Sequence, residues 1–530
     1  MNRTTMTLIG AVTALAAVTG VAAVAAPDGE ETGASAAAGR KPVERSTLVC
    51  PQPGYSDVAQ TEYTAFAPKG SDGQGGAELF QAGKADTDGT DDDKGDGKGD
   101  GKGKGKNDKD KKDGKDEKKR DEEPGSAAAK PFLPLDAPGK PATARKDTAS
   151  APALFGSADG RLAPGWTVQQ TTQVPVGAGR GLQGTACAPP DTDFWFPGAS
   201  TDKARQDYVH LTNPDSTSAV VDLDLYSKKG KENSEAGEGI TIPPRSTVPV
   251  LLSTLANEPA VNVTLHVVAR SGRVGAQVQA VDKKLGGDWI SGVADPGPSV
   301  VIPGIPSDAT AVRLAVFAPG ENDADLDVRL AGSSGQIAPA GYETLHVRGG
   351  TTKAVDLRDL TKGEPGSLVL SPTEDASSAT PVIAAVRVTR GKGSNQETAF
   401  IPGTAPLVNR ATAADNREKG SSLSLTATGK SATVRVTSSA GSEGGDSVSK
   451  TYKIKSRTTR SLVPPRPEGV KGSYSVTVER LSGGQVHAAR MLERKSKKLP
   501  AFTVQVLPDD RGTVSVPGSG QDLSVLTEGD

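Results

Sequence analysis

The sequence predicts an all-β fold of tandem antiparallel β-sandwich modules with immunoglobulin-like character. Short segments in which apolar and polar residues alternate recur along most of the chain, as in half-buried strands. Turn-forming residues separate these segments, since the chain contains 63 Gly and 38 Pro. Hydrophobic residues make up 35% and aromatic residues 4% of the chain, a composition that disfavours long helices. The same order of segments also repeats along the chain, which indicates several copies of one module.

The stretch 208–278 shows this module most clearly. Asn213-Pro214 closes its first strand, and Pro243-Pro244 marks the end of a strand, because proline cannot donate to a central ladder. Its six predicted strands are 208–212, 219–226, 240–242, 247–252, 261–268 and 274–278.

Later segments repeat this order. The segment 311–320 repeats the opening strand and turn, and 381–386 corresponds to the closing strand. Pro464-Pro465 stands where Pro243-Pro244 stood, in a copy that runs from Ser422 to Ala489. Modules of about 100 residues match the length of one sandwich domain. The predicted modules are 201–298, 299–402 and 403–530, the last with additional terminal strands. A β-propeller is the alternative, with each module split into two four-stranded blades.

Residues 46–200 are predicted to form a degenerate first module that a disordered insertion, 69–151, interrupts. Residues 86–123 are almost wholly Asp, Lys, Gly and Glu, and such a segment cannot offset the conformational entropy lost on folding. Five aspartates between Asp86 and Asp93 suggest a calcium loop, but the closing glutamate of such a loop is missing and neighbouring lysines offset the charge. We therefore expect a solvated insertion and no metal site.

The N-terminal segment, residues 1–27, predicts export. An uncharged run of small and aliphatic residues extends from Thr7 to Ala26 and ends in a small-residue context typical of signal-peptidase sites. The run is also long enough to span a bilayer, so an uncleaved membrane anchor remains the alternative. The rest of the chain is expected to be extracytoplasmic, with contact to the membrane only through this segment.

Cys50 and Cys187 are the two cysteines of the chain, and we expect them to form a disulfide. Disulfides persist in oxidising compartments outside the cytoplasm. The two cysteines flank the charged insertion and lie on predicted strands of the same module, which favours pairing over two independent buried thiols.

The net charge of −2 gives no basic field that would hold nucleic acid. No catalytic or metal-binding sequence motif is present, and we expect no catalytic residue and no cofactor. The four histidines lie far apart in the sequence and are interpreted as ordinary strand residues: His210, His266, His346 and His487.

Two features remain open to a functional interpretation. Asp222 with Asp224, and Asp325 with Asp327, place paired carboxylates on one face of a strand, as glycoside hydrolysis would need. The same spacing is typical of solvated outer strand faces, which we favour. Trp195 lies in a short aromatic run and is interpreted as a core residue, with a platform for sugars or bases as the alternative.

The exported terminus, the strand–Asn-Pro opening at 211–214, the element Ile242-Pro243-Pro244 and the closing strands 272–276 and 484–488 together resemble an actinobacterial family of secreted or membrane-anchored proteins. That family is classified as a domain of unknown function. The resemblance covers roughly residues 46–530 and implies a role in the cell envelope, because genes of the family often lie near those of envelope glycosyltransferases.

The sequence thus predicts a non-catalytic extracytoplasmic protein that acts as a scaffold or binding module for surface glycans or partner proteins. The alternative is a carbohydrate-active enzyme with an unrecognised carboxylate site.

Overall fold

The computed structural model describes residues 39–54, 56–70, 72–84, 130–147, 151–374, 379–494 and 499–516. These ranges form antiparallel sheets with one short parallel pair, β5 (Gly83–Lys84) with β16 (Ser246–Leu251). This confirms the all-β prediction. The helical elements of these ranges are single 3-10 turns: η1 (Gly160–Leu162), η2 (Glu235–Gly237), η3 (Leu252–Thr254) and η4 (Gly393–Asn395).

Residues 43–512 form one compact unit, and the described residues 39–42 and 513–516 belong to another. The larger unit consists of four sandwiches, each with a hydrophobic core between two sheets. The core of the third sandwich continues into two strands of the fourth, through Ala489, Phe502 and Val504.

The first sandwich pairs the sheet β2-β8-β4-β6 with the sheet β10-β9-β3-β7. Its core includes Tyr63, whose hydroxyl donates a hydrogen bond of 2.8 Å to the carbonyl of Pro152. Its strands are β2 (Arg45–Cys50), β3 (Gln60–Phe66), β4 (Ala77–Gln81), β6 (Leu133–Leu135), β7 (Ala142–Lys146), β8 (Leu154–Asp159), β9 (Thr167–Val174) and β10 (Gly181–Ala186).

The second sandwich pairs the sheet β11-β17-β13-β14, with β15 on β13, with the sheet β19-β18-β12-β16-β5. Buried and half-buried residues alternate strictly along β13, as the sequence pattern predicts for a strand with one face on a core. Its remaining strands are β11 (Asp193–Ala199), β12 (Arg205–Thr212), β13 (Ala219–Ser227), β14 (Gly230–Lys231), β15 (Ile240–Ile242), β17 (Val263–Ser271), β18 (Gly275–Asp282) and β19 (Gly286–Ile290).

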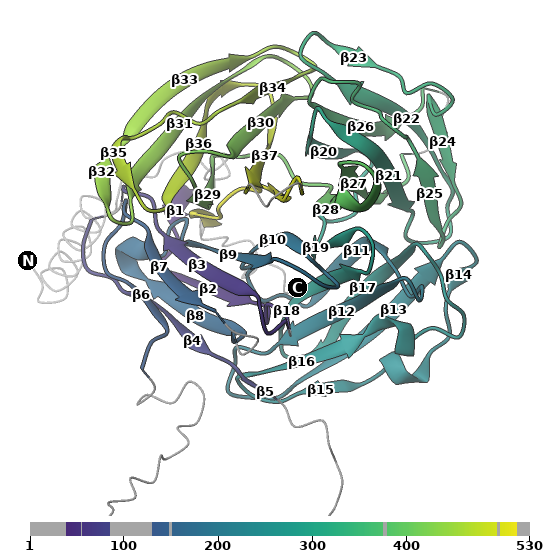
Figure 1. Ribbon diagram of the computed structural model, residues 1–530, viewed down its shortest axis with the longest axis horizontal. Coiled ribbons are helices and arrows are strands. Elements are labelled where there is room, and N and C mark those ends of the chain that lie inside the picture. Colours follow the sequence, from purple (N-terminus) through teal and green to yellow (C-terminus); the bar gives the residue numbers. More distant parts are fainter. Residues whose placement is uncertain are drawn as a thin grey trace, which may run out of the picture. The chain divides into compact units, whose positions relative to one another are not determined.

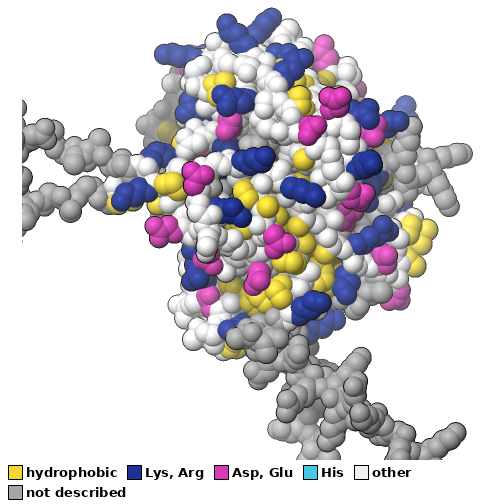
Figure 2. All heavy atoms as spheres, turned by 90° about the vertical axis from the view of Figure 1, so that its left-hand side faces the viewer, with side chains coloured by type: hydrophobic (Ala, Val, Ile, Leu, Met, Phe, Trp, Pro, Cys, Tyr) yellow, Lys and Arg dark blue, Asp and Glu magenta, His cyan; other side chains and the backbone are white. Residues whose placement is uncertain are grey.

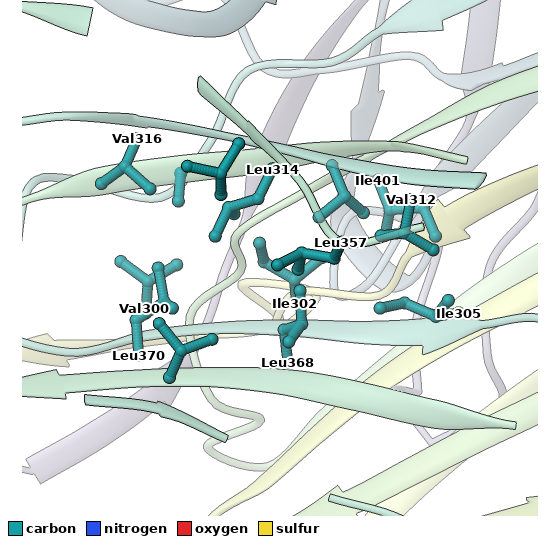
Figure 3. Packing of buried hydrophobic residues seen from close by; sticks show 14 of the residues in the cluster. Val300, Ile302, Ile305, Val312, Leu314, Val316, Leu357, Leu368, Leu370 and Ile401 are labelled. Atoms are coloured by element: carbon teal, nitrogen blue, oxygen red, sulfur yellow. The ribbon is translucent and has the colours of Figure 1, made fainter. Parts of the chain in front are cut away.

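The third sandwich pairs the sheet β20-β26-β22-β23, with β24 on β22, with the sheet β25-β21-β27-β28. Figure 3 shows its core, where Leu314 and Val316 of one sheet face Leu368 of the other. Its strands are β20 (Val300–Ile305), β21 (Ala309–Phe317), β22 (Ala324–Ala331), β23 (Gln336–Ile337), β24 (Thr344–Val347), β25 (Thr352–Asp356), β26 (Gly366–Pro372), β27 (Ile383–Arg390) and β28 (Glu397–Pro402).

The fourth sandwich pairs the sheet β29-β36-β31-β32-β35, with β33 on β31, with the sheet β34-β30-β37-β38. Its strands are β29 (Arg410–Asn416), β30 (Ser421–Ala427), β31 (Ala432–Gly441), β32 (Gly444–Asp446), β33 (Val448–Ile454), β34 (Thr458–Leu462), β35 (Glu468–Lys471), β36 (Tyr474–Gly483), β37 (Val486–Glu493) and β38 (Phe502–Val506).

The chain crosses several times between the two sheets of a sandwich. In the second sandwich, β12 lies in one sheet, β13 and β15 in the other, and β16 again in the first. This crossing connectivity is that of a Greek-key sandwich, whereas a propeller blade is an independent four-stranded sheet. The sandwich prediction therefore describes the modules better than the propeller alternative.

The four sandwiches of the larger unit surround a common centre (Figure 1). The last strand of each sandwich, namely β10, β19, β28 and β38, is the edge of its sheet. We call these four the inner strands. β10 contacts β19, β19 contacts β28, β28 contacts β38, and β38 contacts β10, so the inner strands form a closed cycle.

Parts of the predicted disordered insertion, 69–151, are ordered. β4, β6 and β7 lie within it, and all three pair with strands of the first sandwich. These strands are only three to five residues long and lie close to a highly charged segment. Their alternation of apolar and polar residues was therefore too short to be recognised in the sequence. The most charged part, 86–123, including the aspartates considered for calcium, lies outside the described residues.

β11 belongs to a different sandwich from the one that the sequence indicated. Asp193–Ala199 was expected at the end of the first module, but its strand pairs with β17 of the second sandwich. The first sandwich already ends with β10, and among the described strands β10 pairs with β9 alone.

In the smaller unit, β1 (Gly39–Pro42) pairs antiparallel with β39 (Thr513–Val516). Thr513–Val516 was predicted as a terminal strand of the last module, and it instead pairs with a segment from near the start of the chain. The predicted signal or anchor segment, residues 1–27, lies outside the described residues.

Charged side chains of both signs are interspersed over the face drawn in Figure 2. This agrees with the near-zero net charge of the sequence.

A buried ionic network joins the fourth sandwich to the first. Asp415 of β29 accepts hydrogen bonds from Thr171 Oγ1 of β9 at 2.7 Å and from Ser473 Oγ at 2.8 Å. Arg417 lies 3.0 Å from Asp415 Oδ1 and also binds Glu62 of β3. Burial alone would raise the pKa of Asp415, but the positive charges around it outweigh that effect and hold the pKa below its usual value.

We expect Asp415→Asn to destabilise the larger unit. The substitution removes the buried charge of Asp415 and leaves the half-buried Arg417 with Glu62 as its remaining ion-pair partner among the described residues. Removing one member of a buried ion pair costs up to about 3–5 kcal/mol. Urea unfolding should show a lower midpoint for Asp415→Asn, whereas Asp136→Asn, at an exposed carboxylate, should shift the free energy of unfolding by no more than about 0.5 kcal/mol. Equal midpoints for the two variants would contradict the role assigned to Asp415.

Candidate functional site

The site is built on the inner strands. An edge strand has backbone N–H groups that no neighbouring strand accepts, and such groups are costly when they are buried. At one end of the inner strands, two carboxyl groups accept hydrogen bonds from such N–H groups. Glu397 Oε1 of β28 accepts from Leu182 N at 2.7 Å and from Phe502 N at 3.2 Å.

Asp288 of β19 has the corresponding role. Its Oδ1 accepts from Gly184 N at 3.0 Å, and its Oδ2 lies 3.0 Å from Thr503 Oγ1. Glu397 and Asp288 thus each connect β10 to β38, from two other sandwiches. We call these two residues the carboxylate brace.

Both carboxyl groups of the brace are buried. Burial raises the pKa of Glu397 to about 8 and raises the pKa of Asp288 well above its usual value. The neighbouring charge of Glu397 raises the pKa of Asp288 further. The brace therefore carries protons at neutral pH that free carboxyl groups would have lost.

The residues that follow the inner strands line a depression of about 330 Å³, which we call the central depression. All four sandwiches contribute to it, through Ala186, Ser291, Pro402 and Gln505 among others. Its polar lining residues are Asp191, Asp193, Gln277, Ser291, Asp295, Thr404, Gln505 and Arg511.

A larger groove of about 760 Å³ adjoins the central depression. The two share the segments 293–295 and 403–405, so they form one continuous hollow. We call this second part the side groove. Asp327 and Arg329 line it and form an ion pair of 3.0 Å.

His487 lines this hollow, and its ring is neutral near pH 7. Its Nδ1 lies 3.0 Å from the carbonyl of Thr404, which can only accept, so Nδ1 carries the proton of the neutral ring. Burial lowers the pKa of His487 to about 4. The ring therefore fixes the segment at Thr404 rather than titrating near pH 7.

The other histidines lie on separate strands, as predicted. His210 of β12 is buried against Trp289, and burial lowers its pKa to about 4. His266 of β17 stacks on Trp195, and His346 of β24 binds Asp325 at 2.9 Å.

The carboxylates proposed from the sequence do not meet at one site. Asp222 binds Arg270 at 2.5 Å and Asp224 binds Lys231 at 2.8 Å, both at partly exposed positions of β13. Asp325 binds His346. Asp327 is the exception, because it lines the side groove together with Asp295 and Glu374.

Trp195 belongs neither to a sandwich core nor to an open platform. Its neighbours Phe194 and Phe196 pack on the core of the second sandwich, so alternation turns Trp195 to the other side of β11. There its ring stacks on His266, with centroids 3.5 Å apart, and lies 5.3 Å from the ring of Phe317 in the third sandwich. Trp195 thus contributes an apolar contact between two sandwiches.

Cys50 and Cys187 form a disulfide. It joins β2 to the residue that follows β10 and is buried, and Cys187 lies in the wall of the central depression. The bond indicates an oxidising, extracytoplasmic environment.

Within the described part of the chain, no group of three or more His, Cys, Asp or Glu residues is arranged to hold a metal ion. No helix of that part has the length and apolar character needed to cross a bilayer.

The fold and the hollow define a multi-sandwich β protein with an open groove at the meeting point of its modules. The chain belongs to a family of unknown function, DUF5719, whose model matches residues 142–465. The match begins at β7 and ends just after β34, so it includes the third sandwich entirely and the second sandwich except for β5. No curated protein and no solved structure matches the chain significantly.

The carboxylate brace predicts a pH-dependent contribution to stability. Because the pKa of Glu397 is raised in the folded state, its contribution is fully present below the ordinary carboxyl pKa and is lost as the pH rises through about 8. Glu397→Gln keeps an oxygen that can accept the N–H groups of Leu182 and Phe502 but cannot ionise. We expect the variant to match the wild type near pH 5 and to gain on the order of 2–4 kcal/mol relative to it near pH 9.

Thermal unfolding of both proteins across this pH range measures the difference. Glu321→Gln, at an exposed position, is the control and should show no such change with pH. A difference between Glu397→Gln and wild type that stays constant from pH 5 to pH 9 would show that Glu397 ionises freely.

Proposed function

We propose that this protein is a non-catalytic component of the cell envelope that binds surface glycans or partner proteins. The resemblance of its modules to an actinobacterial family of exported proteins supports an envelope role, and residues 1–27 would export or anchor the chain. The buried disulfide supports a location outside the cytoplasm.

The observation that carries the proposal is the continuous hollow formed by the central depression and the side groove. Its walls present amide, hydroxyl and carboxylate groups from several sandwiches, such as Gln277, Thr404 and Asp295. Groups of this kind form hydrogen bonds with the hydroxyls of sugars or with a peptide backbone. The inner strands and the carboxylate brace hold these walls in fixed positions, which reduces the entropy lost on binding.

A substitution at Ala405 tests the hollow directly. Ala405 is exposed and lines both the central depression and the side groove, so Ala405→Trp should obstruct their junction without disturbing a core. Ala204→Trp, at another exposed alanine outside the hollow, is the matched control. We expect the immobilised wild-type protein and Ala204→Trp to retain a cell-wall polysaccharide or an envelope protein, and Ala405→Trp to bind it at least about tenfold more weakly.

Wild-type protein that retains neither wall polymers nor envelope proteins would contradict the proposed function. Equal retention by Ala405→Trp and wild type would contradict the assignment of the hollow as the binding site.

One observation favours a second candidate, hydrolysis of a polysaccharide. Asp327, Asp295 and Glu374 line the same side groove, and glycoside hydrolysis uses two carboxyl groups that flank the bond to be broken. Incubation of the wild-type protein with a panel of polysaccharides should then release reducing ends, and Asp327→Asn should abolish the release. Absence of turnover by the wild-type protein would remove this candidate.

A further inference from the structure

A second cleft, separate from the central hollow, lies between the second and third sandwiches. It has a volume of about 610 Å³, within the range of sites for small molecules. Residues of the second sandwich, including Lys228 and Asn262, form one wall, and residues of β21 and β25 in the third sandwich form the other. We call it the basic cleft.

The lining of the basic cleft has an excess of positive charge. Its basic residues are Lys228, Lys229, Arg313 and Lys353, and its acidic residues are Glu232 and Glu258. Glu258 is already bound to Lys229 at 2.9 Å. Lys228 and Lys353 are exposed at the cleft, so their ammonium groups are available to an anion that enters it.

Arg313 adds a guanidinium group whose charge no bound carboxylate neutralises. Its Nε donates to the amide oxygen of Asn262 at 3.2 Å, and no ion pair of Arg313 occurs within the described ranges. Asp356 lies opposite Arg313 in β25, but it accepts the backbone N–H of Arg358 at 2.9 Å.

The strand on the other side of Arg313 places a second guanidinium group next to it. Arg387 of β27 is the direct cross-strand partner of Arg313 in β21, so both side chains lie on the same face of the sheet. Like charges directly opposite each other destabilise a sheet. Burial, together with the charges of Arg205 and Arg313, lowers the pKa of Arg387 to about 10, although Asp282 and Asp207 partly offset this effect. An anion held beside Arg313 would relieve this repulsion.

The two walls of the basic cleft are also fixed to each other. Thr352 Oγ1 of β25 lies 2.7 Å from the carbonyl of Tyr226 and 2.9 Å from Thr264 Oγ1, both in the second sandwich. Trp195 and Phe317 make an apolar contact across the same junction. The basic groups are therefore held in position before any ligand arrives.

We propose that the basic cleft binds a small anionic sugar, with Arg313, Lys353 and Lys228 contacting its phosphate or carboxylate group. Arginine suits bidentate contact with either group, and lysine supplies a mobile point charge. The anionic group follows from the charge of the cleft alone, whereas the sugar portion rests on the proposed function.

Calorimetric titration of the full chain at low ionic strength with glucose 1-phosphate, glucuronate and glucose tests the proposal. At least one of the two anions should bind about tenfold or more tightly than glucose. Tighter binding of glucose 1-phosphate assigns the site to phosphate, and tighter binding of glucuronate assigns it to carboxylate. The bound anion should also raise the thermal unfolding temperature.

Lys353→Gln and Arg313→Gln should each weaken binding of the preferred anion by about tenfold. Lys203→Gln, at an exposed lysine outside the cleft, and Ala405→Trp, in the central hollow, should leave it unchanged. Failure of anion binding in the basic cleft can thus be told apart from failure of ligand binding in the hollow, because different variants affect the two sites. The proposal is overturned if neither anion binds more tightly than glucose, or if both cleft variants bind the anion as the wild type does.

Discussion

The assembly of four sandwiches depends on how the edges of their sheets are satisfied. Each inner strand has a sheet partner on one side only, and its other side is turned toward the buried centre of the unit. Water would accept the free N–H groups of an exposed edge, but a buried edge needs an acceptor from the protein. Asp288 and Glu397 supply these acceptors for Leu182, Gly184 and Phe502. The carboxylate brace therefore converts four separate edges into one closed centre.

The contacts between neighbouring sandwiches differ in character. The second and third sandwiches meet through aromatic rings, with Trp195 against Phe317. The fourth and first meet through buried charge, with Arg417 between Asp415 and Glu62. The chain connects the second sandwich to the third directly, whereas the fourth and first are distant in sequence and close the cycle. A buried ionic contact tolerates few alternative arrangements, because any misplacement leaves a charge unpaired.

The alternation of apolar and polar residues was sufficient to predict the all-β sandwich class and most of the strands, since it depends on local geometry alone, but it missed the short strands β4, β6 and β7. The disulfide was predicted because an exported protein meets an oxidising compartment and because Cys50 and Cys187 lie on strands of the same module. The sequence could not indicate the carboxylate brace, because Glu397 resembles any polar residue at the start of a strand and its N–H partners lie in other sandwiches. The sequence also assigned Asp193–Ala199 to the first module instead of the second. This strand lies at the boundary between the two modules, and its residue pattern does not show with which module it pairs. Paired aspartates on one strand were a poor guide to the side groove, whose carboxylates Asp295, Asp327 and Glu374 come from three separate segments.

Amide hydrogen exchange at the inner strands tests the closed centre most directly. Leu182, Gly184 and Phe502 belong to edge strands, and their N–H groups should nevertheless exchange as slowly as those in the middle of the sheets, such as Leu314 of β21. Exchange of these three amides at the rate of exposed outer edges would show that the inner strands open to solvent and that the carboxylate brace does not join the sandwiches.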